Sequence, residues 1–352
     1  MPPPSASATP KISQQRIAKD LGLSQALVSM VLNGRREGIS EESYRRIWEH
    51  AISLGYQPKG MRVSQNGEAT KQIHVGFVLR SGLALHTQSN YFSHIQHGLH
   101  EALQERGIST LFLGTEDRLN ETAFRATLET RKSLFGVVVM GEVKPAFLKA
   151  VKNLCPRVVA VSISYPGQCH SVQSNEAQSL ELLVEHLVGL GHRRFGWLGG
   201  NRALQRHEDR YRAFRAALKA RDIEFDEGWA MLDDNADRQE GRITAERFLA
   251  KRGKRPTALV CYNGLMARGA INLFQARGID VPGDLSVVAI DATRVCTEEH
   301  PHITAASADP EAMGRKAAEL LLGASGSPDE IYLDAALPSR LTLRETTAAP
   351  AS

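Results

Sequence analysis

The stretch that decides the fold of the N-terminal region is LSQALVSMVLNGRREGIS, residues 23–40. Val28, Val31 and Leu32 recur at the spacing i, i+3 and i+4, so a helix would turn them toward a core together with Leu27. The other side of that helix carries short, uncharged residues: Gln25, Ala26, Ser29, Met30 and Asn33. A solvated helix surface usually carries Glu and Lys, so this face favours contact with the major groove of DNA. An outer face that is small by chance is the alternative.

The residues on either side of this stretch predict a helix-turn-helix. Ser13 can cap a helix over residues 14–21, and Gly22 can take the left-handed conformation that ends it. Ser24 can cap the next helix, over residues 25–33. Two short helices joined by a turn around one glycine are typical of this motif.

A third helix is predicted over residues 41–54. Ser40 can cap it, and the acidic residues of its first turn suit the helix dipole. Its apolar residues would close a three-helix core: Tyr44, Ile47, Trp48, Ala51 and Leu54. The sequence GYQP at residues 55–58 ends the helix.

The excess positive charge of the chain lies in its first fifth. The 352 residues carry a formal net charge of +4, from 43 Lys or Arg and 39 Asp or Glu. Residues 1–66 hold nine Lys or Arg and five Asp or Glu, whereas the rest of the chain holds 34 of each. A basic head on a neutral body suits an anionic polymer as partner.

Composition argues against several other classes of protein. No run of 18 apolar residues exists, so no membrane span is expected. Residues 1–10 have neither a charged n-region nor an apolar h-region, and we expect a disordered leader rather than a secretory signal. The four cysteines are scattered and form no C-x-x-C pair, which indicates a cytoplasmic protein without a disulfide framework or zinc site.

Residues 15–59, QRIAKDLGLSQALVSMVLNGRREGISEESYRRIWEHAISLGYQPK, resemble the headpiece of the lactose-repressor/galactose-repressor family. The matching features are the spacing of Ala18, Gly22 and Val28, the run VSMVLNG and the closing GYQP. The resemblance implies that Gln25, Ala26 and Met30 read bases. It also places Ser24, Ser29 and Asn33 where phosphate or groove-edge contacts are expected.

Two features of the headpiece depart from the family pattern. The position of Met30 is usually arginine, which can read guanine through two hydrogen bonds, whereas methionine can contact a thymine methyl group. We therefore expect an operator without the usual guanine preference at that step. The loop GRREGIS is also one residue longer than the usual pattern. Arg35 and Arg36 in this loop are expected to contact phosphates, with a solvated loop as the alternative.

Residues 59–72, KGMRVSQNGEATKQ, are polar and contain two glycines, which predicts a linker. The resemblance implies a hinge helix that inserts an apolar residue into the minor groove. Here Arg62 stands at the family's alanine position and Gln65 at its leucine position. Either Met61 or Val63 replaces the usual wedge, or the protein bends its DNA less.

The body, residues 73–352, alternates short hydrophobic strands such as IHVGFVLR, GVVVMG and LSVVAID with helical segments. This alternation predicts parallel sheets covered by helices on both faces. The length exceeds one such sheet, so we expect two subdomains: residues 73–191 with 308–330, and residues 192–307 with 331–352.

The body also resembles that of the same family, which is similar to periplasmic sugar-binding proteins. ARGIDVPGDLSVVAID, PHIT and LPSRLTLRET carry this resemblance toward the C-terminus. The expected fold class is α/β: a three-helix helix-turn-helix headpiece at residues 11–58, a hinge, and a body of two doubly wound subdomains that binds an effector and dimerises.

Ligands of such folds bind in the crevice at the carboxyl ends of strands. The resemblance implies ligand contacts for Arg210, in DRYRAFRAAL, and for Asn263 and Asp291, each at the end of a predicted strand. Such donors and acceptors suit a sugar or polyol, although Asn263 and Asp291 could instead cap the segments that follow. Phe92 offers an aromatic stacking face or belongs to the core.

The predicted function is that of a DNA-binding transcriptional regulator, as a repressor, controlled by a small effector bound between two subdomains. A homodimer on a palindromic operator follows from this class, and neither cofactor nor metal is expected. His94, His97 and His100 form a polar helix face, because the i, i+3, i+6 spacing swings the side chains around the helix. A sugar-metabolising enzyme, or a ligand-binding protein without DNA binding, remains the alternative.

Overall fold

In the computed structural model, the chain divides into two units, Met1–Thr70 and Lys71–Ser352. The structure describes the following residues: 13–32, 39–53, 73–82, 90–119, 122 and 134–351. Among these residues, no helix is long and apolar enough to cross a membrane.

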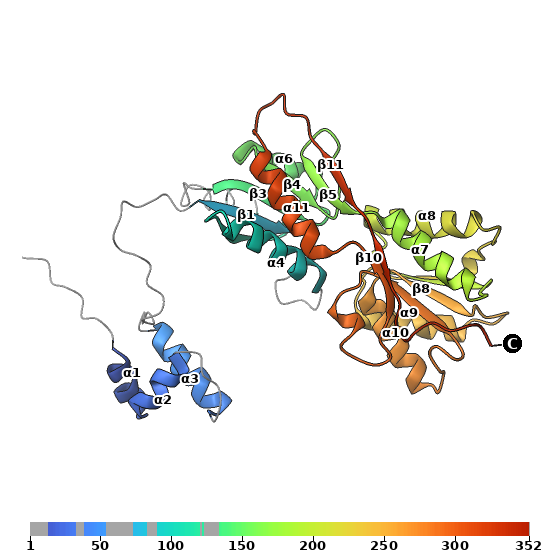
Figure 1. Cartoon of the computed structure of the whole chain (residues 1–352), viewed down its shortest axis with the longest axis horizontal. Coiled ribbons are helices and arrows are strands. Elements are labelled where there is room, and N and C mark those ends of the chain that lie inside the picture. The colour runs from blue at the N-terminus through green and yellow to red at the C-terminus, as the bar shows by residue number, and fades with distance from the viewer. Residues whose placement is uncertain are drawn as a thin grey trace, which may run out of the picture. The chain divides into compact units, whose positions relative to one another are not determined.

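Three helices form the described part of the first unit: α1 (Gln14–Leu21), α2 (Gln25–Leu32) and α3 (Glu41–Ser53) (Figure 1). Their apolar faces meet in one small core, formed by Ile17, Ala18, Val28, Val31, Leu32, Ile47 and Ala51. The three predicted helices are therefore confirmed. The residues predicted to end the second and third helices, Asn33 and Leu54, lie outside the described residues.

The ends of these helices follow from local chemistry. Ser13, Ser24 and Ser40 each accept a hydrogen bond, 3.2 Å long, from the backbone N–H three residues further on. Such bonds satisfy donors that the first turn of a helix leaves without a partner. Gly22 ends α1 with φ of 66°, in the left-handed region that glycine adopts without strain.

The first sheet of the Lys71–Ser352 unit has the order β11-β5-β4-β3-β1-β2, and its strand pairs are parallel. Its strands are β1 (His74–Leu79), β2 (Ser109–Thr115), β3 (Leu134–Met140), β4 (Val158–Val161), β5 (His170–Ser174) and β11 (Asp334–Leu337). Helices α4 (Asn90–Gln104) and α11 (Pro310–Gly323) pack side by side against one face (Figure 1). Helix α6 (Pro145–Leu154) covers the other face.

The second sheet has the order β12-β10-β9-β8-β6-β7. Its strands are β6 (Phe195–Gly199), β7 (Ala230–Leu232), β8 (Ala258–Cys261), β9 (Ser286–Ile290), β10 (Thr304–Ser307) and β12 (Arg340–Thr342). All pairs are parallel except β10 with β12. Helices α7 (Glu176–Gly189) and α8 (Gln205–Lys219) cover one face, and α9 (Arg238–Ala250) and α10 (Gly264–Ala276) cover the other. Two 3-10 turns complete this half, η1 (Glu227–Trp229) and η2 (Arg294–Cys296).

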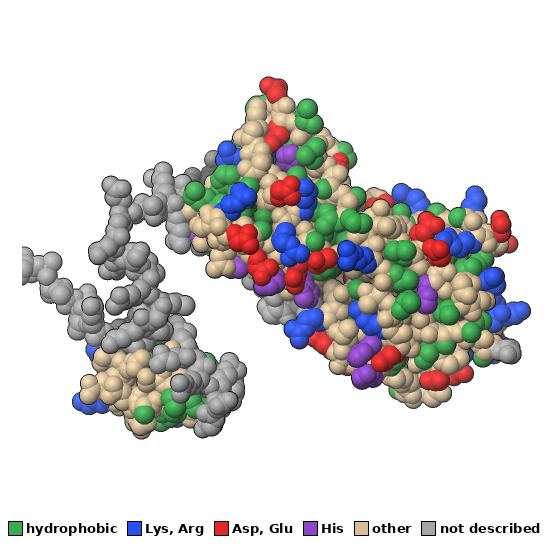
Figure 2. All heavy atoms as spheres, in the orientation of Figure 1, with side chains coloured by type: hydrophobic (Ala, Val, Ile, Leu, Met, Phe, Trp, Pro, Cys, Tyr) green, Lys and Arg blue, Asp and Glu red, His purple; other side chains and the backbone are tan. Residues whose placement is uncertain are grey.

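These two sheets confirm the predicted α/β architecture. Strands β4, β8 and β9 are buried along their whole length, as expected when helices cover both faces of a parallel sheet. Acidic and basic side chains are interspersed over the face of this unit shown in Figure 2, in keeping with its balanced charge.

The chain passes from one sheet to the other between β5 and α7, between β10 and α11, and between β11 and β12. Two predicted boundaries are therefore wrong. Helix α7 precedes residue 191 but covers the second sheet, and β11 follows residue 331 but pairs with β5 of the first sheet. Helix α7 was assigned to the first half because it directly follows strands of the first sheet in sequence. Strand β11 was assigned to the second half because its composition, Asp-Ala-Ala-Leu, gives no strong strand signal.

Candidate nucleic-acid interface and ligand cavity

The two faces of α2 differ in exposure. Val28, Val31 and Leu32 are buried, whereas Gln25 and Ala26 are exposed and Met30 is 38% exposed. The predicted division of this helix into a core face and an outer face is confirmed. An outer face of this composition offers a side-chain amide, a methyl group and a thioether to a partner, and DNA contact through it remains a prediction.

Of the other residues predicted to contact DNA, the structure describes only Ser24 and Ser29. Ser24 is exposed, but its hydroxyl oxygen caps α2, so the residue already has a structural role. Ser29 is half-buried. The remaining predicted contacts lie outside the described residues: Asn33, Arg35, Arg36, Met61 and Arg62.

A cavity of about 290 Å³ lies between the two sheets of the Lys71–Ser352 unit. Its walls come from residues that follow strands β1, β3 and β4 of the first sheet and β6, β7, β8 and β9 of the second. The cavity is therefore at the carboxyl ends of parallel strands, where ligands of open α/β sheets bind. Its volume, near the lower end of the roughly 300–1,000 Å³ typical of ligand sites, suits a small metabolite.

A second hollow, of about 790 Å³, lies beside α8 and is lined by residues of the segment 208–227 alone. No strand end contributes to it, and only one half of the body forms it. The smaller cavity has convergent polar groups from both halves, and we therefore take it as the candidate ligand site.

Three of the four residues predicted to contact an effector line the cavity: Phe92, Asn263 and Asp291. The fourth, Arg210, does not. Its side chain is fully buried behind the cavity wall, and the arginine of α8 that lines the cavity is Arg206, one helical turn earlier. The prediction for Arg210 therefore needs correction: it supports the wall, and Arg206 faces the ligand space.

Arg210 and Arg206 share two carboxylates. Arg210 donates to Asp291 through both terminal nitrogens, at 2.7 and 3.0 Å, and to Glu176 through Nε at 2.9 Å. Arg206 donates to the same carboxylates, at 2.8 Å to Glu176 and 3.2 Å to Asp291. Glu176 lies at the start of α7, so the cluster joins three elements of the second half.

The balance of burial and charge in this cluster favours the ionised forms. Burial alone would lower the pKa of the Arg206 guanidinium, but the carboxylates of Glu176 and Asp291 act against burial, and the pKa lies well above its usual value. Burial would raise the pKa of Asp291, but Arg210 and Arg206 outweigh that effect and lower it. A carboxylate that remains charged when buried between two guanidiniums is a fixed acceptor.

Tyr91 connects this cluster to the first half of the body. The Arg206 guanidinium lies over the Tyr91 ring, 4.7 Å from its centroid, and donates to the Tyr91 hydroxyl at 3.2 Å. Ser162 also donates to that hydroxyl, at 3.2 Å. Burial raises the pKa of Tyr91, so the phenol stays neutral. Arg206 thus contacts both halves at the cavity.

Asn263 has a structural role at the cavity wall. Its side-chain oxygen accepts from the Met266 backbone N–H at 2.8 Å and caps α10, and its amide nitrogen donates to the Ala236 carbonyl at 2.8 Å. The alternative that Asn263 caps the following helix is therefore borne out, although the residue also lines the cavity. One amide hydrogen remains for a ligand.

Three residues that line the cavity have positive φ without being glycine: Ser162 at 67°, Asn201 at 54° and Asp291 at 67°. Left-handed backbone is costly for such residues and is found preferentially at functional sites. Each follows a strand, and the sharp change of chain direction turns its side chain or backbone toward the cavity.

Arg80 adds a cation on the first-half side of the cavity. Its guanidinium donates to the Ser81 carbonyl at 3.1 Å. Burial lowers the pKa of Arg80, and the nearby Arg206 acts in the same direction. The surroundings of this half-buried guanidinium disfavour its positive charge. A hydrogen-bond acceptor on a ligand would therefore stabilise the charged form.

Arg206 and Glu176 were not predicted as site residues, although the sequence contains a signal for each. Arg206 and Arg210 are four residues apart on one helix, so their side chains share a face. Glu176 follows strand β5 and begins helix α7, but its partner arginines are 30 and 34 residues away. Only the packing of α7 against α8 shows that these groups meet.

Comparisons with known proteins agree with this fold. A family profile described as a periplasmic binding protein-like domain matches residues 184–347. The HTH-type transcriptional repressor PurR of Aliivibrio fischeri (strain ATCC 700601 / ES114) is 25% identical over 309 residues, which cover 87% of this chain and 89% of the relative. PurR of Pectobacterium carotovorum subsp. carotovorum (strain PC1) is 27% identical over 312 residues, or 87% and 88% of the two chains.

Solved structures share the fold along nearly the whole chain. A complex of the transcriptional regulator CelR with cellobiose has a TM-score of 0.68 at 21% identity, covering 95% of this chain and 99% of that one. A lac repressor dimer bound to operator and the anti-inducer ONPF has a TM-score of 0.66 at 23% identity, covering 97% and 100%.

A helix-turn-helix unit and a periplasmic-binding-protein-like body in one chain define a class of ligand-binding helix-turn-helix proteins. Within that class, the chain is similar to HTH-type transcriptional repressors and shares the fold of the lac repressor, in keeping with the resemblance of its headpiece sequence to the lactose-repressor/galactose-repressor family.

Proposed function

We propose that this protein is a sequence-specific DNA-binding transcriptional repressor whose operator affinity is controlled by a small polar effector. The observation that carries the proposal is the uncharged outer face of α2, where Gln25, Ala26 and Met30 are exposed while the aliphatic residues of the same helix are buried. A face of this kind fits the major groove, where base edges are distinguishable.

The operator should be a palindrome read by a homodimer. One headpiece of three short helices buries too little surface for tight, specific binding, and two-fold pairing doubles the contact. The lac repressor structure similar to this chain is a dimer bound to operator. Ser24, Ser29, Asn33, Arg35 and Arg36 are the proposed phosphate and groove-edge contacts around the base-reading residues.

The proposed effector is a sugar or a related polyhydroxylated metabolite. The cavity combines aromatic faces, Tyr91 and Phe92, with the hydrogen-bonding groups of Arg80, Arg206 and Asn263. Aromatic faces with a few polar groups suit a ring that carries hydroxyls. The similar CelR was solved with cellobiose.

Effector binding is proposed to act through the hinge, residues 59–72, with Met61 and Arg62 at the minor groove. Because the cavity is lined by both halves of the body, a ligand that fits one angle between them better would shift the population toward that angle. We propose that the headpiece spans residues 11–58 and the body residues 73–352. Each half of the body is built from segments that are not contiguous in sequence, because the chain crosses between the two sheets.

We propose that the cavity binds a ligand without catalysing a reaction. We also propose that the protein acts in the cytoplasm, where DNA is accessible and cysteines remain as free thiols. The four cysteines are buried and unpaired. An enzyme of sugar metabolism is the competing proposal, and turnover of sugars in the presence of nucleotide would support it.

Selection of double-stranded DNA from a random pool by the full chain tests the proposed function. The expected result is a palindromic consensus whose affinity changes when a sugar identified by thermal-shift screening is added, because such a ligand stabilises the native state. Uniform weak binding to every sequence, or an affinity that the stabilising sugar leaves unchanged, would contradict it.

A further inference from the structure

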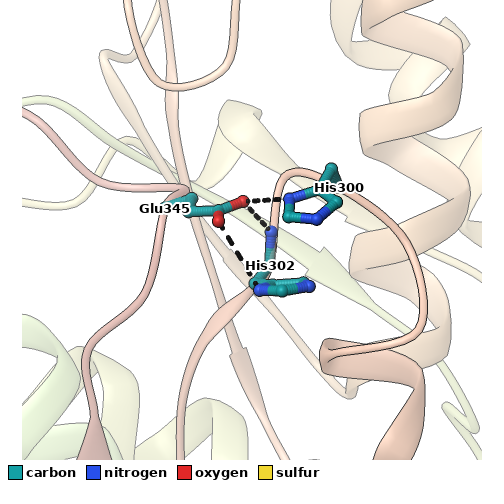
Figure 3. Close-up of side chains that lie close together, drawn as sticks. All are labelled: His300, His302 and Glu345. Carbon is teal, nitrogen blue, oxygen red and sulfur yellow. Dashed lines mark hydrogen bonds and ion pairs between the residues drawn. The ribbon is translucent and has the colours of Figure 1, made fainter.

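Two histidines and a glutamate lie together at the edge of the second sheet (Figure 3). His300 Nδ1 is 2.9 Å from one carboxylate oxygen of Glu345, and His302 Nδ1 is 3.5 Å from the other. The two imidazole rings are stacked, with centroids 4.1 Å apart and planes 27° apart. Both rings therefore present the same nitrogen to one carboxylate.

The strand register brings these residues together. Strand β10 pairs antiparallel with β12, and Ala305 lies opposite Thr342. Continuing that register by three residues places His302 opposite Glu345, and the Glu345 N–H indeed donates to the His302 carbonyl at 2.9 Å. His300 lies two residues earlier, in the bend that leads to β10, and its ring stacks on the His302 ring, which brings it to the same carboxylate.

The segment that carries the histidines is held in place. The His302 backbone N–H donates to the Glu345 carboxylate at 2.7 Å. The fully buried Arg268 donates from one terminal nitrogen to the carbonyls of Glu299 and Pro301, at 2.7 and 2.9 Å. The donor atoms are thus positioned by bonds that do not depend on a ligand.

We propose that His300, His302 and Glu345 bind a divalent transition-metal ion, Zn²⁺ above others, through the two Nδ1 atoms and a carboxylate oxygen. Imidazole and carboxylate are ligands that this ion prefers. Donor atoms of a tetrahedral zinc site lie about 3.3 Å apart for bonds of about 2.0–2.1 Å. The observed distances, 2.9 Å from His300 Nδ1 to one Glu345 oxygen and 3.5 Å from His302 Nδ1 to the other, bracket that spacing, and one potential ligand atom from each of the three residues lies within 4.8 Å of the other two.

Binding exchanges protons for the ion. Each imidazole must bind as the neutral ring with Nδ1 unprotonated and its proton on Nε2: an imidazolium releases its Nδ1 proton to solvent, and a neutral ring protonated at Nδ1 gives up that proton and takes one from solvent at Nε2. The side chain of His300 is 75% exposed and that of Glu345 is 45% exposed. Water can therefore reach the ion and supply a further ligand.

This site is distinct from the ligand cavity. The histidines precede β10, at the amino ends of the parallel strands, whereas the cavity lies at their carboxyl ends. A bound ion would fasten the segment after β12 to the segment before β10, and would stabilise the body without occupying the effector space.

Titration of the untagged, EDTA-treated full chain with Zn²⁺ and Co²⁺ tests the proposal. We expect calorimetry to detect binding that H300A and H302A each weaken at least tenfold and that E345Q also weakens. Zn²⁺ should raise the melting temperature of the wild type but not of H300A. H97A is the matched control, because His97, Glu101 and Glu311 form the other cluster of potential ligands among the described residues. H97A should bind at the histidine pair as the wild type does.

Wild-type affinity in both H300A and H302A would overturn the proposal, and so would loss of all binding in H97A. An intense Co²⁺–thiolate absorption band would also overturn it, because that band would assign the ion to a cysteine. H300A alters an exposed side chain and should keep the melting temperature of the metal-free wild type. H300A therefore decides the question if H302A fails to fold.

Discussion

Arg210 holds Asp291 through two parallel hydrogen bonds, Nη2 to Oδ1 at 2.7 Å and Nη1 to Oδ2 at 3.0 Å, and no part of the Arg210 side chain is exposed. The same guanidinium donates to the Tyr262 carbonyl at 2.5 Å and lies over the Tyr262 ring, 4.7 Å from its centroid. This pairing fixes the orientation of the carboxylate that lines the ligand cavity.

Replacing Arg210 with alanine should destabilise the body strongly. The change leaves Asp291 and part of Glu176 as buried carboxylates with fewer partners, and removal of one member of such a pair costs about 3–5 kcal/mol. Urea unfolding monitored by circular dichroism measures the loss. The exposed R212A, on the same helix, is the control and should change the free energy of unfolding by less than about 0.5 kcal/mol. A loss for R210A as small as that of the control would contradict the assigned role.

Replacing Arg206 with alanine should affect ligand binding more than stability. Arg210 still neutralises the shared carboxylates in R206A, but the donor that lines the cavity is gone. We expect at least a tenfold weaker response to the sugar that stabilises the wild type, with a smaller loss of unfolding free energy than in R210A. Calorimetric affinity and urea unfolding separate the two effects. An unchanged ligand affinity would show that Arg206 only supports the wall.

Met30 should make the operator differ from the usual family half-site. Methionine cannot form the paired hydrogen bonds by which arginine reads guanine, whereas M30R could restore them at a gain of about 1–3 kcal/mol in discrimination. Selection from random DNA should recover guanine at that step for M30R and not for the wild type. M30L, which keeps an apolar side chain, is the control. Recovery of the ordinary half-site by the wild type would contradict the prediction.

Gln25 should contribute to the sequence specificity of DNA binding rather than to its electrostatic component. Replacing it with alanine should weaken binding to the selected operator by about 1–3 kcal/mol, because a base-edge hydrogen bond is lost. The salt dependence of binding should stay the same, since no phosphate contact is removed. Fluorescence anisotropy at several salt concentrations measures both quantities. Q104A, which changes an exposed glutamine of α4 in the body, should leave both unchanged.

Acid should destabilise the body partly through His192. Its Nε2 donates to the Ala348 carbonyl at 2.9 Å, which leaves Nδ1 to accept from the Thr257 hydroxyl at 2.9 Å. Burial lowers the pKa of His192, so the unfolded chain takes up the proton first as the pH falls below about 6.5. Stability present at pH 7.5 is therefore lost progressively below that pH.

Urea unfolding of wild type and H192N between about pH 7.5 and 5 checks the effect of this histidine. The wild type should lose more stability over this range than H192N. His186 and His207 also have pKa values lowered by burial, so H192N should remain partly acid-sensitive. Equal losses in the two proteins would assign the acid sensitivity to other groups.

The headpiece could be predicted from sequence because its signals are local. Serine caps, the left-handed Gly22 and the spacing of Val28, Val31 and Leu32 act within a few residues of one another. The position of α7 could not be predicted in this way, because the helix belongs to a sheet whose strands follow it in sequence. Burial of Leu183 and Leu187 against Trp197 decides that position, and it depends on tertiary packing.

The candidate site was predicted in part. Asn263 and Asp291 follow recognisable strands, and strand ends predict proximity to a crevice. The roles of Arg206 and Arg210 could not be separated, because only the docking of α8 decides which of two residues on one helix face meets the cavity. His302 and Glu345 are 43 residues apart, and their contact follows from the pairing of β10 with a strand of three residues.

The alternation of the chain between the two sheets limits how the protein can be shortened or split. A polypeptide ended at residue 309 would keep β10 but lose α11, and would uncover the apolar side of the first sheet that Met313, Ala317 and Leu321 protect. Engineered reporters made from this protein should therefore carry fused domains at loop tips within one half, and a fragment truncated at a crossing should aggregate.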